Sequence, residues 1–144
     1  QALRGKRVSF RVADATRRWP LKSGSYDFAI DCFASTDIES PRGRAKARNE
    51  LFRVLKPGGY LLVYTLSTDD EFHKLMLKQS PGKERNSFIH PTTGKFEKVF
   101  DWTELQKMYK PFKLVAKARI RTTTVFFGKS YRCKHFWLVY QKPL

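Results

Sequence analysis

A Pro57-Gly58-Gly59 stop, placed between a helical pattern and an apolar run, constrains the fold more than any other feature of the sequence. From Arg42 to Leu55, apolar residues recur at nearly helical spacing among many charges, which predicts an amphipathic helix. Proline and two glycines cannot continue it. Tyr60 to Leu66 then forms a nearly continuous apolar run, typical of a central strand covered on both faces. A helix that leads directly into a buried strand indicates an α/β domain.

Two shorter β-rich runs precede this helix. Val8 to Ala13 ends at Asp14-Ala15-Thr16, and Tyr26 to Cys32 has Asp31 near its end. Both runs predict strands that finish in polar residues. The connection from Arg17 to Ser25 contains a proline and a glycine and is too short for a good helix. We therefore expect a loop between two strands.

Two further helices are expected after the central strand. Thr68-Asp69-Asp70-Glu71 resembles an N-cap with an acidic first turn, and leads into a short helix over Phe72 to Lys78. Asp101 and Glu104 form a pattern typical of a capping box, for a helix through Tyr109. Between the helices, Ser80 to Thr93 predicts an inserted, lid-like loop.

The C-terminal part of the sequence predicts two long strands. Leu114 to Thr124 and His135 to Gln141 are rich in β-branched, aromatic and other apolar residues. Phe126 to Lys134 joins them, with Gly128 as the expected turn residue. Because this connection is short, we expect the pair to be antiparallel.

Length and composition indicate one domain. The 144 residues are 41% hydrophobic, enough to bury a core, and no run approaches the roughly 18 apolar residues of a membrane span. The start at Gln1 shows no initiating Met and no signal-peptide pattern, so we expect a soluble, truncated chain. Cys32 and Cys133 lie far apart and belong to no zinc-type cluster. We expect reduced thiols and a cytoplasmic location.

The sequence is strongly basic. Its formal net charge is +16, from 29 Lys and Arg against 13 Asp and Glu. Such a charge favours a nucleic acid or another anionic surface as a partner. The basic residues are scattered along the whole chain, so a simple solvated basic surface is an equal alternative.

Three segments carry a resemblance to a known family. They are Val12-Ala13-Asp14-Ala15 followed by Pro20-Leu21, then Ser25 to Asp31, and Leu55 to Leu62 with its KPGG tetrapeptide. In this order the chain resembles the C-terminal two-thirds of a class I S-adenosylmethionine-dependent methyltransferase domain. The resemblance implies an incomplete doubly wound, Rossmann-like sheet, mostly parallel with an antiparallel last strand. Residues 1–144 would then be a partial domain that lacks its first strand, glycine-rich loop and second strand.

The resemblance also implies a set of cofactor-binding residues. Asp14 would accept a hydrogen bond from the adenine amine of S-adenosylmethionine, and the Ala15 backbone N–H would meet a ring nitrogen. Asp31, Cys32 and Phe33 would line the pocket, because ligands of such sheets lie across the carboxyl ends of the strands. Asp14 capping a local turn is the structural alternative. We expect Cys32 to be a small buried residue rather than a nucleophile.

Catalysis implies no particular side chain. In methyl transfer from a sulfonium the cofactor supplies the electrophile, and the protein mainly aligns the acceptor. His73 or His90 could act as a base, although a lone His is more often a packing or surface residue. Thr65, Ser67 and Thr68 would line the substrate side or cap the next helix.

The sequence also departs from the family pattern. It has no glycine-rich loop and no acidic residue after a second strand to hold the ribose. Gln1 to Arg7 resembles the end of the helix before the third strand of the family. In the sheet order of the family, the absent strands would lie between the strand at Val8 to Ala13 and the strand at Tyr26 to Cys32. The expected function is methyl transfer to an unidentified acceptor, inactive in this fragment. The alternatives are a catalytically dead, basic RNA-binding module and a structural subunit whose sheet another chain completes.

Overall fold

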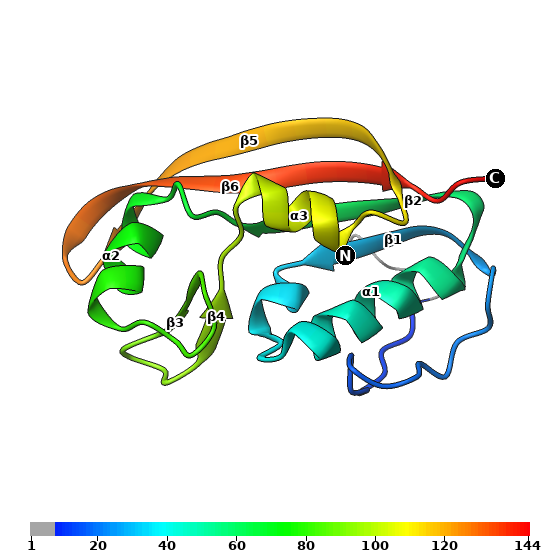
Figure 1. Cartoon of the computed structure of the whole chain (residues 1–144), viewed down its shortest axis with the longest axis horizontal. Helices are drawn as coiled ribbons and strands as arrows, with labels where there is room; N and C mark the ends of the chain where they lie inside the picture. Colours follow the sequence, from blue (N-terminus) through cyan, green and yellow to red (C-terminus); the bar gives the residue numbers. More distant parts are fainter. Residues whose placement is uncertain (1–7) are drawn as a thin grey trace.

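A computed structural model describes residues 8–144; the expected helix end at residues 1–7 lies outside them. Its main sheet has four strands in the order β1-β2-β6-β5 (Figure 1). These are β1 (Tyr26–Cys32), β2 (Leu55–Leu66), β5 (Lys113–Phe126) and β6 (Lys129–Gln141). β1 pairs parallel with β2, and β6 is antiparallel to both of its neighbours. The α/β class and the inserted antiparallel last strand are confirmed, but the described sheet is mixed rather than mostly parallel.

The remaining elements lie between the strands. They are the short 3-10 helix η1 (Ala34–Asp37) and the helices α1 (Pro41–Val54), α2 (Glu71–Gln79) and α3 (Trp102–Met108). Asp101 and Glu104 form the expected capping box of α3, whereas Asp70 caps α2. None of the helices in residues 8–144 is long and apolar enough to cross a membrane.

The expected loop over residues 80–93 proves to contain part of a β-hairpin. β3 (Ser87–Ile89) pairs antiparallel with β4 (Phe96–Lys98). Phe88 of β3 is fully buried in a cluster with Phe72 and Met76 of α2. The prolines and glycines of this segment indicated a loop, but burial of Phe88 under α2 depends on contacts distant in sequence.

The strand expected at Val8 to Ala13 is wrong. This segment has no regular secondary structure, and Phe10 and Val12 are 90% and 107% exposed. β-propensity stabilises a strand only when a neighbouring strand supplies hydrogen bonds and side-chain contacts. Among residues 8–144, no strand pairs with this segment, and β1 is left as an edge of the sheet.

The helix stop forms the N-terminal part of β2 rather than a turn before it. Tyr26 of β1 pairs with Leu55, but Phe28 pairs with Tyr60, so Lys56 to Gly59 bulge out of register. Gly58 has φ of 76°. A Cβ on Gly59 would lie 2.9 Å from the Lys56 carbonyl oxygen and 3.1 Å from that of Asp27. Both glycines are therefore required by the backbone of this bulge.

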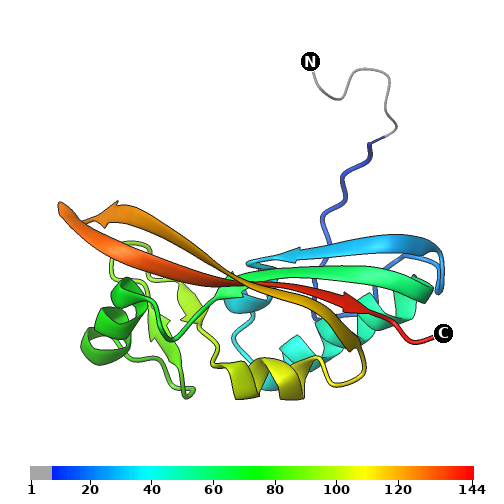
Figure 2. The ribbon, with the colours of Figure 1, turned by 90° about the horizontal axis from the view of Figure 1, so that it is seen from above.

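All three α-helices cover the same face of the sheet (Figure 2). Leu61, Val63 and Leu138 are fully buried on that face, in a core that also includes residues of α1 and α3. The opposite face is open: Phe28 is 50% and Ile30 58% exposed. The central strand is thus covered on one face, not on both as its apolar run predicts.

Candidate functional site

Three aromatic side chains gather where the parallel strands end. Phe33 follows β1, Tyr64 lies near the carboxyl end of β2, and His135 comes from β6. Their ring centroids are 4.6 to 5.5 Å apart. The Tyr64 hydroxyl and His135 Nδ1 are hydrogen bonded at 3.1 Å, and burial raises the pKa of Tyr64. Carboxyl ends of parallel strands are where such sheets bind ligands.

Phe33 holds an uncommon backbone conformation. Its φ of 58° is in the left-handed region, which a bulky residue rarely adopts. The Phe33 N–H donates to the Tyr64 carbonyl oxygen at 2.9 Å, and its own carbonyl accepts from the Thr36 hydroxyl. The turn into η1 therefore fixes the Phe33 ring beside Tyr64.

Asp31, expected in the cofactor pocket, points into the covered side of the sheet. One carboxylate oxygen accepts from the Ser35 N–H at 3.1 Å, and the other accepts from the Tyr109 hydroxyl at 3.0 Å. Tyr109 is fully buried, which raises the pKa of its hydroxyl well above the ordinary value. Asp31 thus ties η1 and the end of α3 to the sheet.

Cys32 points to the opposite, open face and is exposed. The expectation that it is buried is wrong, because side chains alternate across a strand and Asp31 occupies the inward position. Cys32 lies directly across from Tyr64 in the strand register. Both Cys32 and the buried Cys133 are free thiols.

Asp14 and Ala15 lie apart from this group. One Asp14 oxygen accepts from the Thr16 N–H and hydroxyl at 2.8 and 2.7 Å, and the other pairs with Arg17 at 3.1 Å. These hydrogen bonds lower the pKa of Asp14. The Ala15 carbonyl accepts from the Trp19 indole N–H. Asp14 therefore adopts the turn geometry of the structural alternative, in a hollow beside α1.

The hydroxyl residues in the last part of β2 and directly after it are buried or half-buried. Thr65 and Ser67 are buried, and the Ser67 hydroxyl accepts from Arg119 at 2.6 Å and from the Asp69 N–H at 3.1 Å. The Thr68 N–H donates to the Phe100 carbonyl oxygen. None of these three hydroxyl residues is fully exposed to an incoming substrate.

A second polar group lies beside the aromatic one. Asp70, His73 and His135 each offer one ligand atom, and these atoms lie within 4.8 Å of one another. His73 was a candidate base from the sequence, but His135 was not, because 62 positions separate the two histidines. The Asp70-x-x-His73 spacing at the start of a helix was the available signal. The ring of His90 packs instead against Phe72 and Phe127.

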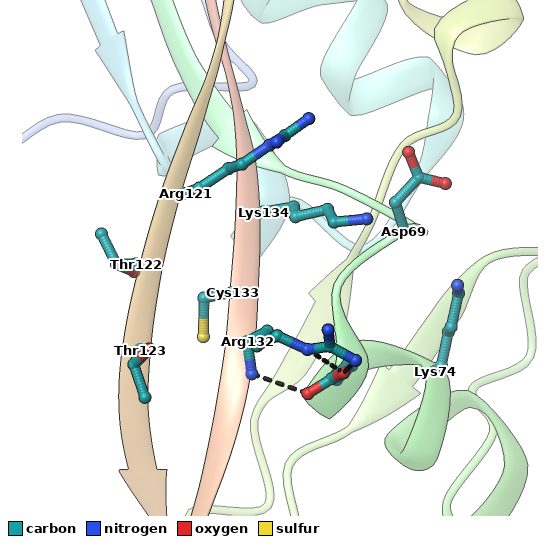
Figure 3. Close-up of a pocket in the computed structure, with 9 residues that line it drawn as sticks. Asp69, Lys74, Arg121, Thr122, Thr123, Arg132, Cys133 and Lys134 are labelled. Atoms are coloured by element: carbon teal, nitrogen blue, oxygen red, sulfur yellow. Dashed lines mark hydrogen bonds and ion pairs between the residues drawn. The ribbon is translucent and has the colours of Figure 1, made fainter.

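A basic hollow of about 740 Å³ lies between β5, β6 and the start of α2 (Figure 3). Arg132 donates to Glu71 through its backbone N–H and its guanidinium, at 2.7 and 2.6 Å. Lys74, Arg121 and Lys134 also line the hollow, and the described residues place no carboxylate within 4 Å of their charged groups. The hollow therefore presents free positive charge.

The strand order β1-β2-β6-β5, with β6 antiparallel to both of its neighbours, is that of an open, mixed α/β sheet. The first 63 residues match a family model described as a methyltransferase domain. A methyltransferase from Methanosarcina mazei that depends on S-adenosylmethionine superposes with a TM-score of 0.79 at 26% identity, over 94% of this chain and 67% of its own. The resemblance to class I S-adenosylmethionine-dependent methyltransferases is thereby confirmed.

Two further proteins are similar over different lengths. The tRNA (carboxymethyluridine(34)-5-O)-methyltransferase of Macaca fascicularis is 32% identical over 88 residues, which is 61% of this chain and only 12% of that protein. The 1,6-didemethyltoxoflavin-N1-methyltransferase of Burkholderia thailandensis, solved with S-adenosylhomocysteine, has a TM-score of 0.65 at 14% identity. It is matched over 97% of this chain and 53% of its own, and at this identity it shows the fold alone.

Proposed function

We propose that this chain is the C-terminal portion of a domain that transfers methyl groups from S-adenosylmethionine. The observation that carries the proposal is that this chain, with its sheet order β1-β2-β6-β5 and antiparallel β6, superposes over 94% of its length on the Methanosarcina mazei methyltransferase. An antiparallel strand inserted between two others is a specific feature of a sheet, whereas a basic net charge occurs in proteins of many folds.

The described residues fit one part of the cofactor site. Phe33 and Tyr64 present aromatic surface at the carboxyl end of the parallel pair, and the Asp14 carboxylate is exposed. Asp14 and Ala15 would hold the adenine, and Cys32 and Phe33 would form another part of the pocket wall, whereas Asp31 is held on the covered side of the sheet. The bound cofactor would supply the methyl group as an electrophile. The chain's own task would be to align the acceptor.

The open sheet face supports a partial domain. Phe28, Ile30 and Tyr60 expose apolar surface on a face that carries no helix, and β1 is an edge strand. In a stable protein, apolar sheet faces and strand edges are usually covered by other parts of the fold or by a partner. We propose that the remaining part of the methyltransferase domain, with the glycine-rich loop, covers this face from upstream in a longer protein.

Nucleic acid is the acceptor class that we propose. The net charge of +16 and the unpaired cations of the basic hollow favour a polyanion. The tRNA methyltransferase of Macaca fascicularis is similar over 88 residues, which supports the same choice. The hollow opens next to Asp69, at the exit of the central strand, so a phosphate held there would lie near the carboxyl end of the sheet.

Two binding measurements test the proposal. Calorimetric titration with S-adenosylmethionine should give a micromolar dissociation constant for the longer protein. The 144-residue chain should bind about a thousandfold more weakly, because loss of three or four hydrogen bonds costs about 4 kcal/mol or more. Micromolar binding by the chain itself would refute the partial site. No binding by the longer protein would refute the methyltransferase function.

Transfer of a radiolabelled methyl group to RNA tests the acceptor. RNA binding measured at several salt concentrations tests the basic hollow. Arg121→Ala and Lys134→Ala should each reduce the slope of log RNA affinity against log salt by about one, because each removes one phosphate contact. Lys22→Ala, in the exposed loop before β1, is the matched control and should leave the slope unchanged. Transfer to protein or small molecules with no transfer to RNA would refute the nucleic-acid acceptor.

A further inference from the structure

The cluster of Asp70, His73 and His135 has the spacing of metal ligands. Each residue offers one ligand atom, these atoms lie within 4.8 Å of one another, and His135 Nε2 lies 3.8 Å from one Asp70 oxygen. The latter distance exceeds a normal N–H···O hydrogen bond, which ends near 3.2 Å. Tetrahedral Zn²⁺, with bonds of about 2.0–2.2 Å, separates its ligand atoms by roughly 3.3–3.5 Å. Small side-chain rotations would therefore place the three ligands around one ion.

Neighbouring groups hold each ligand from behind. His73 Nδ1 lies 2.9 Å from the Ser67 carbonyl oxygen, which can only accept, so Nδ1 carries the proton and Nε2 is the basic nitrogen. His135 Nδ1 is bonded to the Tyr64 hydroxyl, and in the tautomer in which Nδ1 donates this bond, Nε2 is a base that can face a metal. Such outer contacts orient histidine ligands in metal sites.

The charge of the cluster also favours a cation. Asp70 is completely buried, and its oxygens accept from the backbone N–H groups of His73 and Lys134 at 3.1 and 2.8 Å. Within residues 8–144, the only basic side chains within 4 Å of it are the two imidazoles. A buried carboxylate without a cation is costly.

We propose that Asp70, His73 and His135 bind one Zn²⁺ ion and thereby join the start of α2 to β6. Two imidazole nitrogens and one carboxylate select a transition metal of this type, whereas Mg²⁺ and Ca²⁺ require mainly oxygen ligands. The His135 side chain is 17% exposed, which gives the ion a route of entry beside Tyr64. This site goes beyond the proposed methyl transfer, which needs no metal.

The test is a titration of the purified, chelator-treated chain with Zn²⁺ at pH 7.5, alongside the absorption spectrum with Co²⁺ as a probe. We expect one equivalent to bind with a submicromolar dissociation constant and Co²⁺ to give visible bands of a four-coordinate site. His135→Gln and His73→Gln should each weaken Zn²⁺ binding at least about 100-fold. Tyr64→Phe, which removes only an outer contact, should weaken it about 10- to 100-fold.

The chain provides matched controls. His90→Gln removes the third histidine, outside the cluster, and Cys32→Ser removes the exposed thiol. Both should bind Zn²⁺ as the unmodified chain does. Circular dichroism identifies any variant that fails to fold. In that case, the Co²⁺ spectrum of the unmodified chain decides whether a four-coordinate metal site exists. No binding below about 10 µM, unchanged binding in both histidine variants of the cluster, or loss in Cys32→Ser would overturn the proposal.

Discussion

Tyr109→Phe tests whether the buried Asp31 carboxylate holds α3 and η1 to the sheet. The variant removes one hydroxyl, which donates to Asp31 at 3.0 Å. Asp31 is 5% and Tyr109 1% exposed, so water cannot readily replace the lost donor. A hydrogen bond to a charged group contributes about 1.5–3 kcal/mol. We expect the free energy of unfolding to fall by about 2–3 kcal/mol, since the Ser35 N–H still donates to the other oxygen.

Tyr140→Phe is the matched control. Its ring stacks on that of Tyr109 at 5.0 Å and is also buried, but no described residue bonds to its hydroxyl. Removing an unsatisfied buried hydroxyl should be neutral or stabilise by up to about 1 kcal/mol. Guanidinium denaturation measures the free energy of unfolding of both variants. In a separate thermal scan, the melting temperature of Tyr109→Phe should fall by roughly 8–12 °C. Equal unfolding midpoints for the two variants would refute the argument.

Three further predictions concern a carboxylate, a glycine and the proposed adenine contact. The Arg53 guanidinium lowers the pKa of Glu50 to about 2, so stability should fall as the pH drops from 4.5 toward 2, and Glu50→Gln should flatten that part of a pH-dependent melting curve. In urea denaturation, Gly59→Ala should lower the free energy of unfolding more than Gly24→Ala does, because a Cβ on Gly59 would meet backbone oxygens. A Cβ on Gly24 meets no atom within 4 Å, so Gly24→Ala should lose only about 1–2 kcal/mol, the cost of a left-handed residue with φ of 57°. In the longer protein, Asp14→Ala should weaken S-adenosylmethionine binding by about 1.5–3 kcal/mol, and an unchanged dissociation constant would assign Asp14 to its turn alone.

The sequence by itself determined the elements whose patterns are local. The bounds of β1 were predicted without error, and the helix before the KPGG stop was displaced by only one residue. Spacing of apolar residues, a capping box and a glycine stop act within a few residues, so they can be recognised in a linear chain. The family resemblance supplied the antiparallel insertion of the last strand, which the structure confirms for β6 in the main sheet.

Tertiary structure alone decided the rest. Val8 to Ala13 has the composition of a strand but no partner strand among residues 8–144, whereas Ser87–Ile89 forms a strand because Phe88 is buried under α2. The inward direction of Asp31 follows from the pleat and from the distant hydroxyl of Tyr109. His135 joins Asp70 only through the pairing of β6 with β2. Each of these outcomes depends on residues far apart in sequence, whose contacts no local pattern records.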